Sequence, residues 1–150
     1  MAGIELRSSA FSDHDLIPRK YARDGQNVSP ALRWSHVPAG TAELLLLCED
    51  PDAPSGTFTH WLVTGIDPAA GGVDEGRTPP GGRPWSNGFG NRGWDGPQPP
   101  VGDDPHRYVF RLYALAEPPR LPAEPGAEDV HRAVDDTALA SGTTVGVYQR

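Results

Sequence analysis

The stretch Glu43-Leu44-Leu45-Leu46-Leu47-Cys48-Glu49 decides the fold of this 150-residue chain. It is a continuous apolar run closed by an acidic residue at each end. A run of this length fits a buried central strand better than a helix. It is also far too short to cross a bilayer, which requires about 20 apolar residues in a helix. We therefore predict a central strand here, and further strands over residues 3–7, 31–35, 60–66, 106–115 and 143–148.

Glycine and proline set the fold class around that strand. The chain has 18 glycines and 17 prolines, and in a helix interior each proline costs about 3 kcal/mol and each glycine about 1 kcal/mol. Long helices are therefore disfavoured, and the one helix that we predict covers residues 127–140, with Val130 and Val134 on one face. We expect a single domain over residues 1–150, a mostly β antiparallel sandwich with one or two short helices near the C-terminus.

Residues 67–105 hold most of the glycine and proline. Loops of this length in a compact domain are usually functional or disordered. The aromatic residues Trp85, Phe89 and Trp94 lie within this segment and favour order. We therefore expect a long ordered loop between two strands.

Charge and cysteine usage exclude several partners. The formal net charge is −7, from 13 basic and 20 acidic residues, and no basic stripe is present for nucleic acid. Cys48 is the single cysteine, so no disulfide can form within the chain. The N-terminal segment lacks the basic and apolar regions of a signal peptide. We expect a cytoplasmic protein without a transmembrane segment.

Polar side chains gather at the ends of the predicted strands. Asp50 and Asp52 follow directly after the central run, and His60 begins the next strand. His106 and Tyr108 share one face of their strand because side chains alternate with a period of two. If these strands are neighbours, the five groups converge at one rim of the sandwich. Taken singly, an Asp-Pro-Asp sequence is more typical of a turn, and a histidine at a strand start is more typical of the surface.

The sequence resembles the phosphatidylethanolamine-binding protein family, also called Raf kinase inhibitor-like, in its short bacterial form. The resemblance covers nearly the whole chain and rests on ordered motifs. These are Gly25-Gln26-Asn27-Val28-Ser29-Pro30-Ala31-Leu32-Arg33-Trp34, then Asp50-Pro51-Asp52-Ala53-Pro54-Ser55-Gly56 followed by His60-Trp61, and then Gly96-Pro97-Gln98-Pro99-Pro100-Val101-Gly102 followed by His106-Arg107-Tyr108-Val109-Phe110.

The resemblance implies a sandwich of two antiparallel sheets with a small pocket at its rim. That pocket would bind a small anion such as phosphate, or a phosphorylated head group. Carried over by motif, the ligand-binding residues are Asp50, Asp52, Pro54, His60, His106 and Tyr108, with Gly96 and Pro97 shaping the wall. A cis bond between Ala53 and Pro54 is also implied.

Two positions depart from the family pattern, and two kinds of protein partner follow from the resemblance. Bacterial members commonly have tyrosine at the position of Trp94 and cysteine at the position of Gln98.

Eukaryotic relatives suggest that the protein regulates a kinase or protease. Related bacterial proteins often pair, which makes a homodimer an expectation as well.

The polar residues also allow a mechanism for anion binding. We expect the two carboxylates to accept hydrogen bonds from His60 and His106 and so to raise the pKa of both imidazoles. Protonated histidine and the Tyr108 hydroxyl would then meet the phosphate oxygens. Anion affinity is predicted to fall between about pH 6 and pH 8, as the imidazoles lose their protons.

An enzyme and a metal site are the alternatives. Asp50, His60 and His106 could perform general acid–base catalysis in a hydrolase, lyase or cyclase. No serine or cysteine nucleophile accompanies them, since Cys48 belongs to the apolar run. Two aspartates and two histidines could also bind zinc, but no close ligand spacing is present, and the resemblance implies no metal or cofactor.

Overall fold

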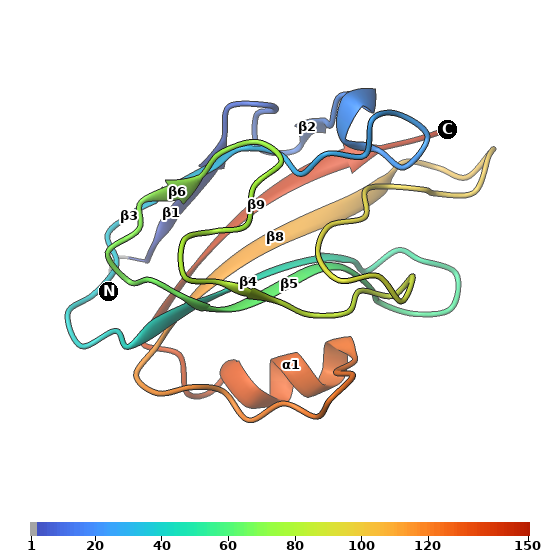
Figure 1. Ribbon diagram of the computed structural model, residues 1–150. Helices are drawn as coiled ribbons and strands as arrows, with labels where there is room; N and C mark the ends of the chain where they lie inside the picture. Colours follow the sequence, from blue (N-terminus) through green and yellow to red (C-terminus); the bar gives the residue numbers. More distant parts are fainter. Residues whose placement is uncertain (1–2) are drawn as a thin grey trace.

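Two β-sheets pack face to face in the computed structural model, which describes residues 3–150 (Figure 1). The strand order is β2-β9-β8-β4-β5-β7 in the larger sheet and β1-β3-β6 in the smaller one. The elements are β1 (Glu5–Ser8), β2 (Asp15–Leu16), the 3-10 turn η1 (Arg19–Tyr21), β3 (Leu32–Ser35), β4 (Glu43–Asp50), β5 (Phe58–Ile66), β6 (Gly72–Val73), β7 (Arg83–Pro84), β8 (His106–Leu115), α1 (Ala127–Val134) and β9 (Ala140–Tyr148).

The predicted β-sandwich with a helix near the C-terminus is confirmed. One pairing corrects the expectation of purely antiparallel sheets. The two-residue strand β2 lies parallel to β9, with Asp15 opposite Gly146 and Leu16 opposite Val147. Every other strand pair is antiparallel. A strand of two residues carries too few side chains to show a period, which explains why β2 was missed.

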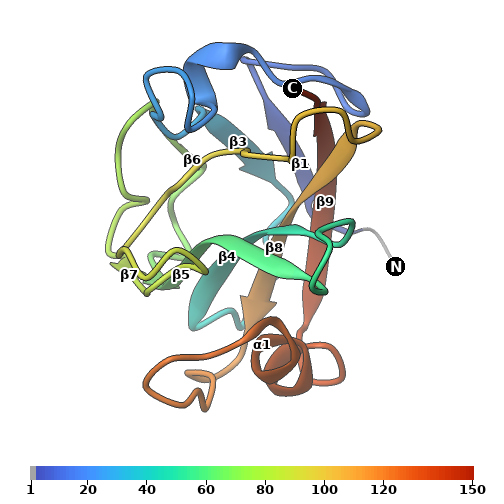
Figure 2. The same cartoon turned by 90° about the vertical axis from the view of Figure 1, so that its right-hand side faces the viewer.

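Strand β4 is apolar from Leu44 to Cys48 because both of its faces are covered. Leu44, Leu46 and Cys48 belong to the core between the two sheets. Leu45 and Leu47 belong to a second core beneath α1, together with Val130 and Val134 of that helix. Figure 2 shows α1 on the side of the larger sheet that faces away from β1, β3 and β6. All these leucine side chains are fully buried. Because both faces of β4 are buried, consecutive residues are apolar and the sequence shows no alternation.

Helix α1 is also fastened to the sheet by charge. Nε2 of His131 lies 2.7 Å from Oε1 of Glu49, and Arg111 of β8 donates to the same carboxylate oxygen. Glu49 is 3% exposed although it carries a carboxylate. Buried charges in proteins are generally paired, and the guanidinium of Arg111 supplies the opposite charge at Oε1, whereas Oε2 of Glu49 has no hydrogen-bond partner among residues 3–150.

The helix is shorter than predicted, and residues 67–105 are ordered as predicted. α1 ends at Val134 rather than at residue 140, because Ala140 already pairs with Ala114 as the first residue of β9. The long segment contains β6, β7 and a bridge between Ser86 and Arg92. Within residues 3–150, neither helical segment is long and apolar enough to cross a membrane.

Candidate ligand-binding pocket

A cavity of about 170 Å³ lies at the rim of the sandwich, where β4 ends and β8 begins. Antiparallel pairing brings these strand ends together, since Cys48 pairs with Phe110 and Glu49 with Val109. Asp50 is consequently placed beside the start of β8. The lining residues are Asp50, Ala53, Pro54, Phe58, His60, Phe89, Gln98, Pro99, Pro100, His106 and Tyr108. Five of the eight residues predicted for the site are in this set.

His106 is held between two carboxylates. Its Nδ1 atom is 2.6 Å from Oδ2 of Asp50, and its Nε2 atom is 3.0 Å from Oδ2 of Asp103. Burial alone would lower the pKa of His106, but the hydrogen bonds to Asp50 and Asp103 and their negative charges outweigh burial and raise it. Since a carboxylate oxygen accepts, both ring nitrogens donate, and this arrangement favours the imidazolium form.

His60 has a different environment from the one expected. Its Nδ1 atom donates to the backbone carbonyl oxygen of Asp95 at 2.7 Å and does not contact the carboxylate of Asp50 or Asp52. Burial lowers the pKa of His60, and the Asp95 carbonyl and the Asp50 charge offset this only in part. The expectation of a raised pKa is therefore confirmed for His106 and wrong for His60. The neutral ring presents Nε2 as a hydrogen-bond acceptor.

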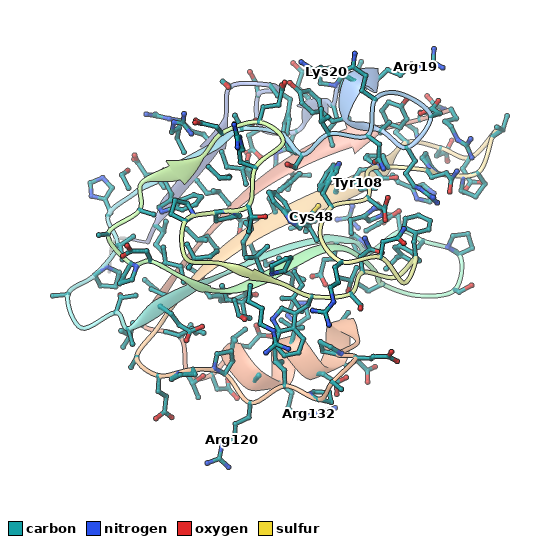
Figure 3. All side chains as sticks on the ribbon, in the orientation of Figure 1. Arg19, Lys20, Cys48, Tyr108, Arg120 and Arg132 are labelled. Atoms are coloured by element: carbon teal, nitrogen blue, oxygen red, sulfur yellow. The ribbon has the colours of Figure 1, made fainter. Side chains whose placement is uncertain are left out.

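Tyr108 lines the cavity and carries a buried hydroxyl group. The residue is fully buried, and its Oη atom has no hydrogen-bond partner among residues 3–150. Figure 3 shows its side chain inside the sandwich, close to Cys48. Burial, followed by the negative charge of Asp50, raises the pKa of Tyr108 and keeps it protonated. A buried hydroxyl without a partner is costly, so Oη of Tyr108 is an uncompensated polar atom of a residue that lines the cavity.

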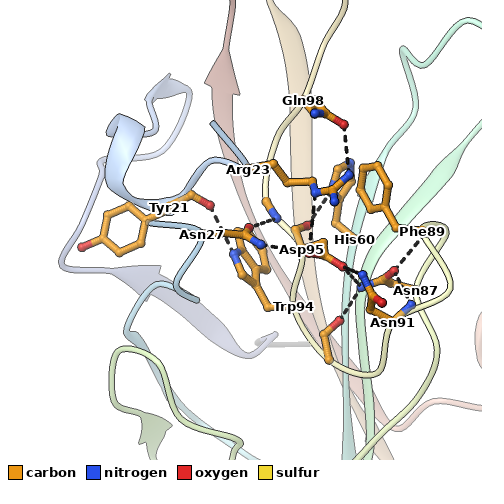
Figure 4. Close-up of polar contacts among 12 residues, drawn as sticks. Tyr21, Arg23, Asn27, His60, Asn87, Phe89, Asn91, Trp94, Asp95 and Gln98 are labelled. Atoms are coloured by element: carbon orange, nitrogen blue, oxygen red, sulfur yellow. Dashed lines mark hydrogen bonds and ion pairs between the residues drawn. The ribbon is translucent and has the colours of Figure 1, made fainter. Parts of the chain in front are cut away.

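Asp95 organises the loop behind His60, and sequence reasoning missed it. Its carboxylate accepts hydrogen bonds from the side-chain amides of Asn27 at 2.9 Å, Asn87 at 2.8 Å and Asn91 at 2.9 Å (Figure 4). Burial acts to raise the pKa of Asp95, but these three amides together lower it. The network fixes the backbone of Asp95, whose carbonyl oxygen orients the imidazole of His60.

Asp52 does not line the cavity, in contrast to the prediction from the motif. Its carboxylate accepts from Nε of Arg107 at 3.0 Å, from Nη2 at 2.8 Å and from the backbone N–H of Arg107 at 2.9 Å. The hydrogen bonds to the Arg107 side chain are the main reason that the pKa of Asp52 is lowered. Its backbone N–H donates to Oδ1 of Asp50 at 2.7 Å. Asp52 thus supports the position of Asp50 from outside the lining.

Gly96 and Pro97 also lie behind the wall rather than on it. The Gly96 N–H donates to Oδ1 of Asn27 at 2.7 Å, and the Pro97 carbonyl accepts from the N–H of Arg23 at 3.1 Å. A Cβ atom on Gly96 would lie 1.9 Å from the carbonyl oxygen of Tyr21. The predicted cis bond before Pro54 is wrong, because every peptide bond within residues 3–150 is trans.

The two departures from the family pattern have separate effects. Trp94 packs in the core between Trp61 and Phe110, and its Nε1 atom donates to the Tyr21 carbonyl oxygen at 3.2 Å. The Nε1 atom of Trp94 therefore forms a hydrogen bond within the fold and does not donate to the cavity. Gln98 lines the cavity directly, and its Oε1 atom accepts from Nη1 of Arg23 at 3.1 Å.

The described residues place limits on two other chemistries. Cys48 is fully buried, and burial raises the pKa of its thiol well above the usual value. A buried thiol of this kind is a core residue and a poor nucleophile. Across residues 3–150, no group of three or more His, Cys, Asp or Glu side chains is arranged to hold a metal ion.

Comparisons with known proteins agree with the fold and the motifs. The family model described as phosphatidylethanolamine-binding protein matches residues 7–149. A UPF0098 protein of Methanothermobacter thermautotrophicus is 43% identical, and the match covers 98% of this chain and 99% of that protein. CT736 of Chlamydia trachomatis, a phosphatidylethanolamine-binding protein homolog, has a TM-score of 0.87 and 32% identity, covering 100% of this chain and 99% of that one.

A second solved structure gives the same result. Escherichia coli YbcL, described as a new member of the mammalian PEBP family, superimposes with a TM-score of 0.88 at 27% identity, covering 99% of each chain. The similar proteins thus come from both archaea and bacteria. This chain belongs to the phosphatidylethanolamine-binding protein family.

Proposed function

We propose that this protein binds a small phosphorylated molecule, either free phosphate or a phosphorylated head group, in the cavity at the sandwich rim. The observation that carries the proposal is Tyr108, which lines the cavity and whose buried Oη atom has no hydrogen-bond partner among residues 3–150. A phosphate oxygen accepts strongly from a hydroxyl group. The cavity volume of about 170 Å³ suits a head group rather than a whole lipid.

The carboxylate at the cavity does not oppose an anion as strongly as its charge suggests. Asp50 shares the imidazolium of His106 with Asp103, so its negative charge is compensated in part by that contact. Nε2 of neutral His60 accepts a hydrogen bond, so it suits a phosphate that carries a proton. A fully ionised phosphate would need His60 to become protonated. Each route takes up one proton, either on the phosphate or on His60, and binding should therefore strengthen as the pH falls.

Calorimetry with inorganic phosphate and with phosphorylethanolamine tests the proposal. We expect the His60→Gln variant to weaken binding by about tenfold, the effect of losing one charge-assisted hydrogen bond. The control is His14→Gln, because His14 is exposed and outside the cavity. Absence of binding to the unaltered protein at millimolar ligand, with no shifts in the imidazole NMR signals, would falsify the function.

The proposal extends to regulation of a kinase or protease, which the family resemblance implies, in the cytoplasm, a location that the single free cysteine favours. The cavity supports this extension because its ligand would contact Gln98 and Pro100, which are exposed at the surface. A partner that senses the bound state should bind differently with and without phosphorylethanolamine. Equal inhibition of a candidate kinase or protease in both states would separate regulation from ligand binding.

A further inference from the structure

The cavity has few hydrogen-bond donors left for an anion. Both ring nitrogens of His106 face carboxylates, and Nδ1 of His60 faces a carbonyl oxygen. The lining side chains that keep a donor are the Tyr108 hydroxyl and the Gln98 amide. Neither carries a positive charge. An anion needs further donors or a compensating charge when it leaves water, so a cation close to this lining is required.

Arg23 lies against the lining at two points. Its guanidinium carbon is 4.0 Å from the centre of the Phe89 ring, and its Nη1 atom donates to Oε1 of Gln98 at 3.1 Å. Phe89 and Gln98 both line the cavity. Figure 4 shows the guanidinium of Arg23 beside these two side chains and near the imidazole of His60. The positive charge is therefore placed at one edge of the cavity.

The backbone and the charge of Arg23 are both anchored. Its N–H donates to the Pro97 carbonyl oxygen at 3.1 Å, and its Nε atom is 3.7 Å from Oδ1 of Asp95. Asp95 already accepts from three asparagine amides. The side chain of Arg23 is 31% exposed, and among residues 3–150 Gln98 is the only acceptor of a hydrogen bond from its guanidinium. Most of the five N–H donors of arginine thus remain free.

Two other arginines lie near the site. Nε of Arg150 donates to the backbone carbonyl oxygen of Pro99, a lining residue, at 2.7 Å. Arg107 uses Nε and Nη2 for the carboxylate of Asp52, which is not part of the lining. A two-point contact of this kind occupies the face of the guanidinium that would recognise an anion. Arg23 is therefore better placed than Arg107, and it differs from Arg150 in contacting the side chains of two lining residues.

We propose that Arg23 is a specificity-determining residue, which supplies positive charge and N–H donors to the anionic oxygens of the ligand at the edge formed by Phe89 and Gln98. The inference rests on the proposed function and adds the group that selects an oxyanion. The organic part of the ligand would lie against the apolar lining, which includes Pro54, Phe58 and Pro99. The ligand class is a small phosphate monoester, with inorganic phosphate as its minimal form.

Phosphate binding by calorimetry, in two salt concentrations, tests this role. Arg23→Gln removes the charge, and we expect the Kd for inorganic phosphate to rise by about tenfold and its salt dependence to weaken. Arg23→Lys keeps the charge but loses the planar stack on Phe89, and should retain part of the affinity. The matched control is Arg92→Gln, because Arg92 is an exposed cation that lies outside the cavity lining, on the loop that carries Phe89 and Gln98.

The outcomes separate the two proposals. If the unaltered protein binds phosphate and Arg23→Gln binds as tightly as Arg92→Gln, the role of Arg23 is overturned and the proposed function stands. If the unaltered protein binds no phosphate, both are overturned. A third outcome is an equal loss of binding in Arg23→Gln and Arg23→Lys, with backbone NMR shifts spread over residues 87–98. It would show that Arg23 stabilises the structure of the cavity wall, and it would contradict a role in recognising the charge of the anion.

Discussion

The imidazole of His106 and the carboxylate of Asp50 form a buried pair across two neighbouring strands, with Nδ1 and Oδ2 2.6 Å apart. Each side chain is 5% exposed. Asp103 contacts the other ring nitrogen of His106, and its side chain is 40% exposed. The two carboxylates therefore act on one imidazole from environments of different polarity, and their removal should have unequal effects.

Asp50→Asn should lower the pKa of His106 more than Asp103→Asn does. The reason is that the interaction of two charges is stronger in a buried setting than near solvent. Removing one partner of a buried pair also costs about 3 kcal/mol of stability, whereas the more exposed pair should contribute about 1 kcal/mol or less. Imidazole NMR titration and urea unfolding measure both effects. Equal pKa changes in the two variants would contradict this ranking.

The stability of the protein should depend on pH through His106. Its pKa is raised in the folded state, so its stabilising contribution is complete below the unfolded value of about 6.5 and is lost as the pH rises through the folded value. Urea unfolding between about pH 6 and pH 9 measures this loss. His106→Gln should flatten the profile in that range. A profile that keeps its slope in the variant would assign the dependence to other groups.

His60 should contribute in the opposite direction at lower pH. Its pKa is lowered on folding, so protonation is easier in the unfolded chain than in the native protein. Stability should therefore fall as the pH drops below the unfolded value of about 6.5. His60→Gln should remove that acidic component and leave the component of His106 in place. Loss of both components together would show that the two imidazoles titrate as one coupled unit.

Gly96→Ala should destabilise the fold by about 1–3 kcal/mol or more. Its Cβ atom would lie 1.9 Å from a backbone oxygen, that of Tyr21, and backbone cannot move aside as a flexible side chain can. Gly71→Ala is the control, since its Cβ atom would meet its nearest neighbour at 3.9 Å and should change stability by about 0.5 kcal/mol at most. Thermal unfolding compares the two. Similar melting temperatures would show that the loop at Gly96 can shift.

Asn27→Ala should cost about 1–3 kcal/mol, because it removes a donor to the buried carboxylate of Asp95 and an acceptor from the N–H of Gly96. The same variant should change the pKa of His60, whose Nδ1 donates to the Asp95 carbonyl oxygen. Asn91→Ala offers a comparison, since Asn91 contacts Asp95 but not Gly96. An unchanged His60 titration in Asn27→Ala would show that the Asp95 backbone is held by other contacts.

The strands were predictable where burial leaves a mark on the sequence. Residues 106–115 match β8 in full, and the run from Glu43 lies within β4. Each of these strands has apolar residues facing both cores, so a periodic or continuous pattern is unavoidable. The short strands β6 and β7 have two residues each, which is too little for any pattern to appear.

The site was predictable only where motif and strand geometry coincide. Asp50 and His106 meet because strand pairing places their strand ends together. The environment of His60 depends instead on the carbonyl oxygen of Asp95, a backbone atom that any residue could supply. Asp95 in turn depends on Asn27, far earlier in the chain. No local pattern encodes such partners, and a role in binding for the lining residues stays a prediction.

The position of β8 between β4 and β9 has a consequence for the order of folding. The hairpin of β4 and β5 closes a short loop, whereas pairing of β4 with β8 must close a loop of more than 50 residues. Long loops form contacts later, because their entropy must be lost before the contacts stabilise them. Asp50 and His106 lie on opposite sides of that late pairing. The cavity therefore requires this long-range pairing, and we expect chains in which β8 has not yet joined β4 to lack the site.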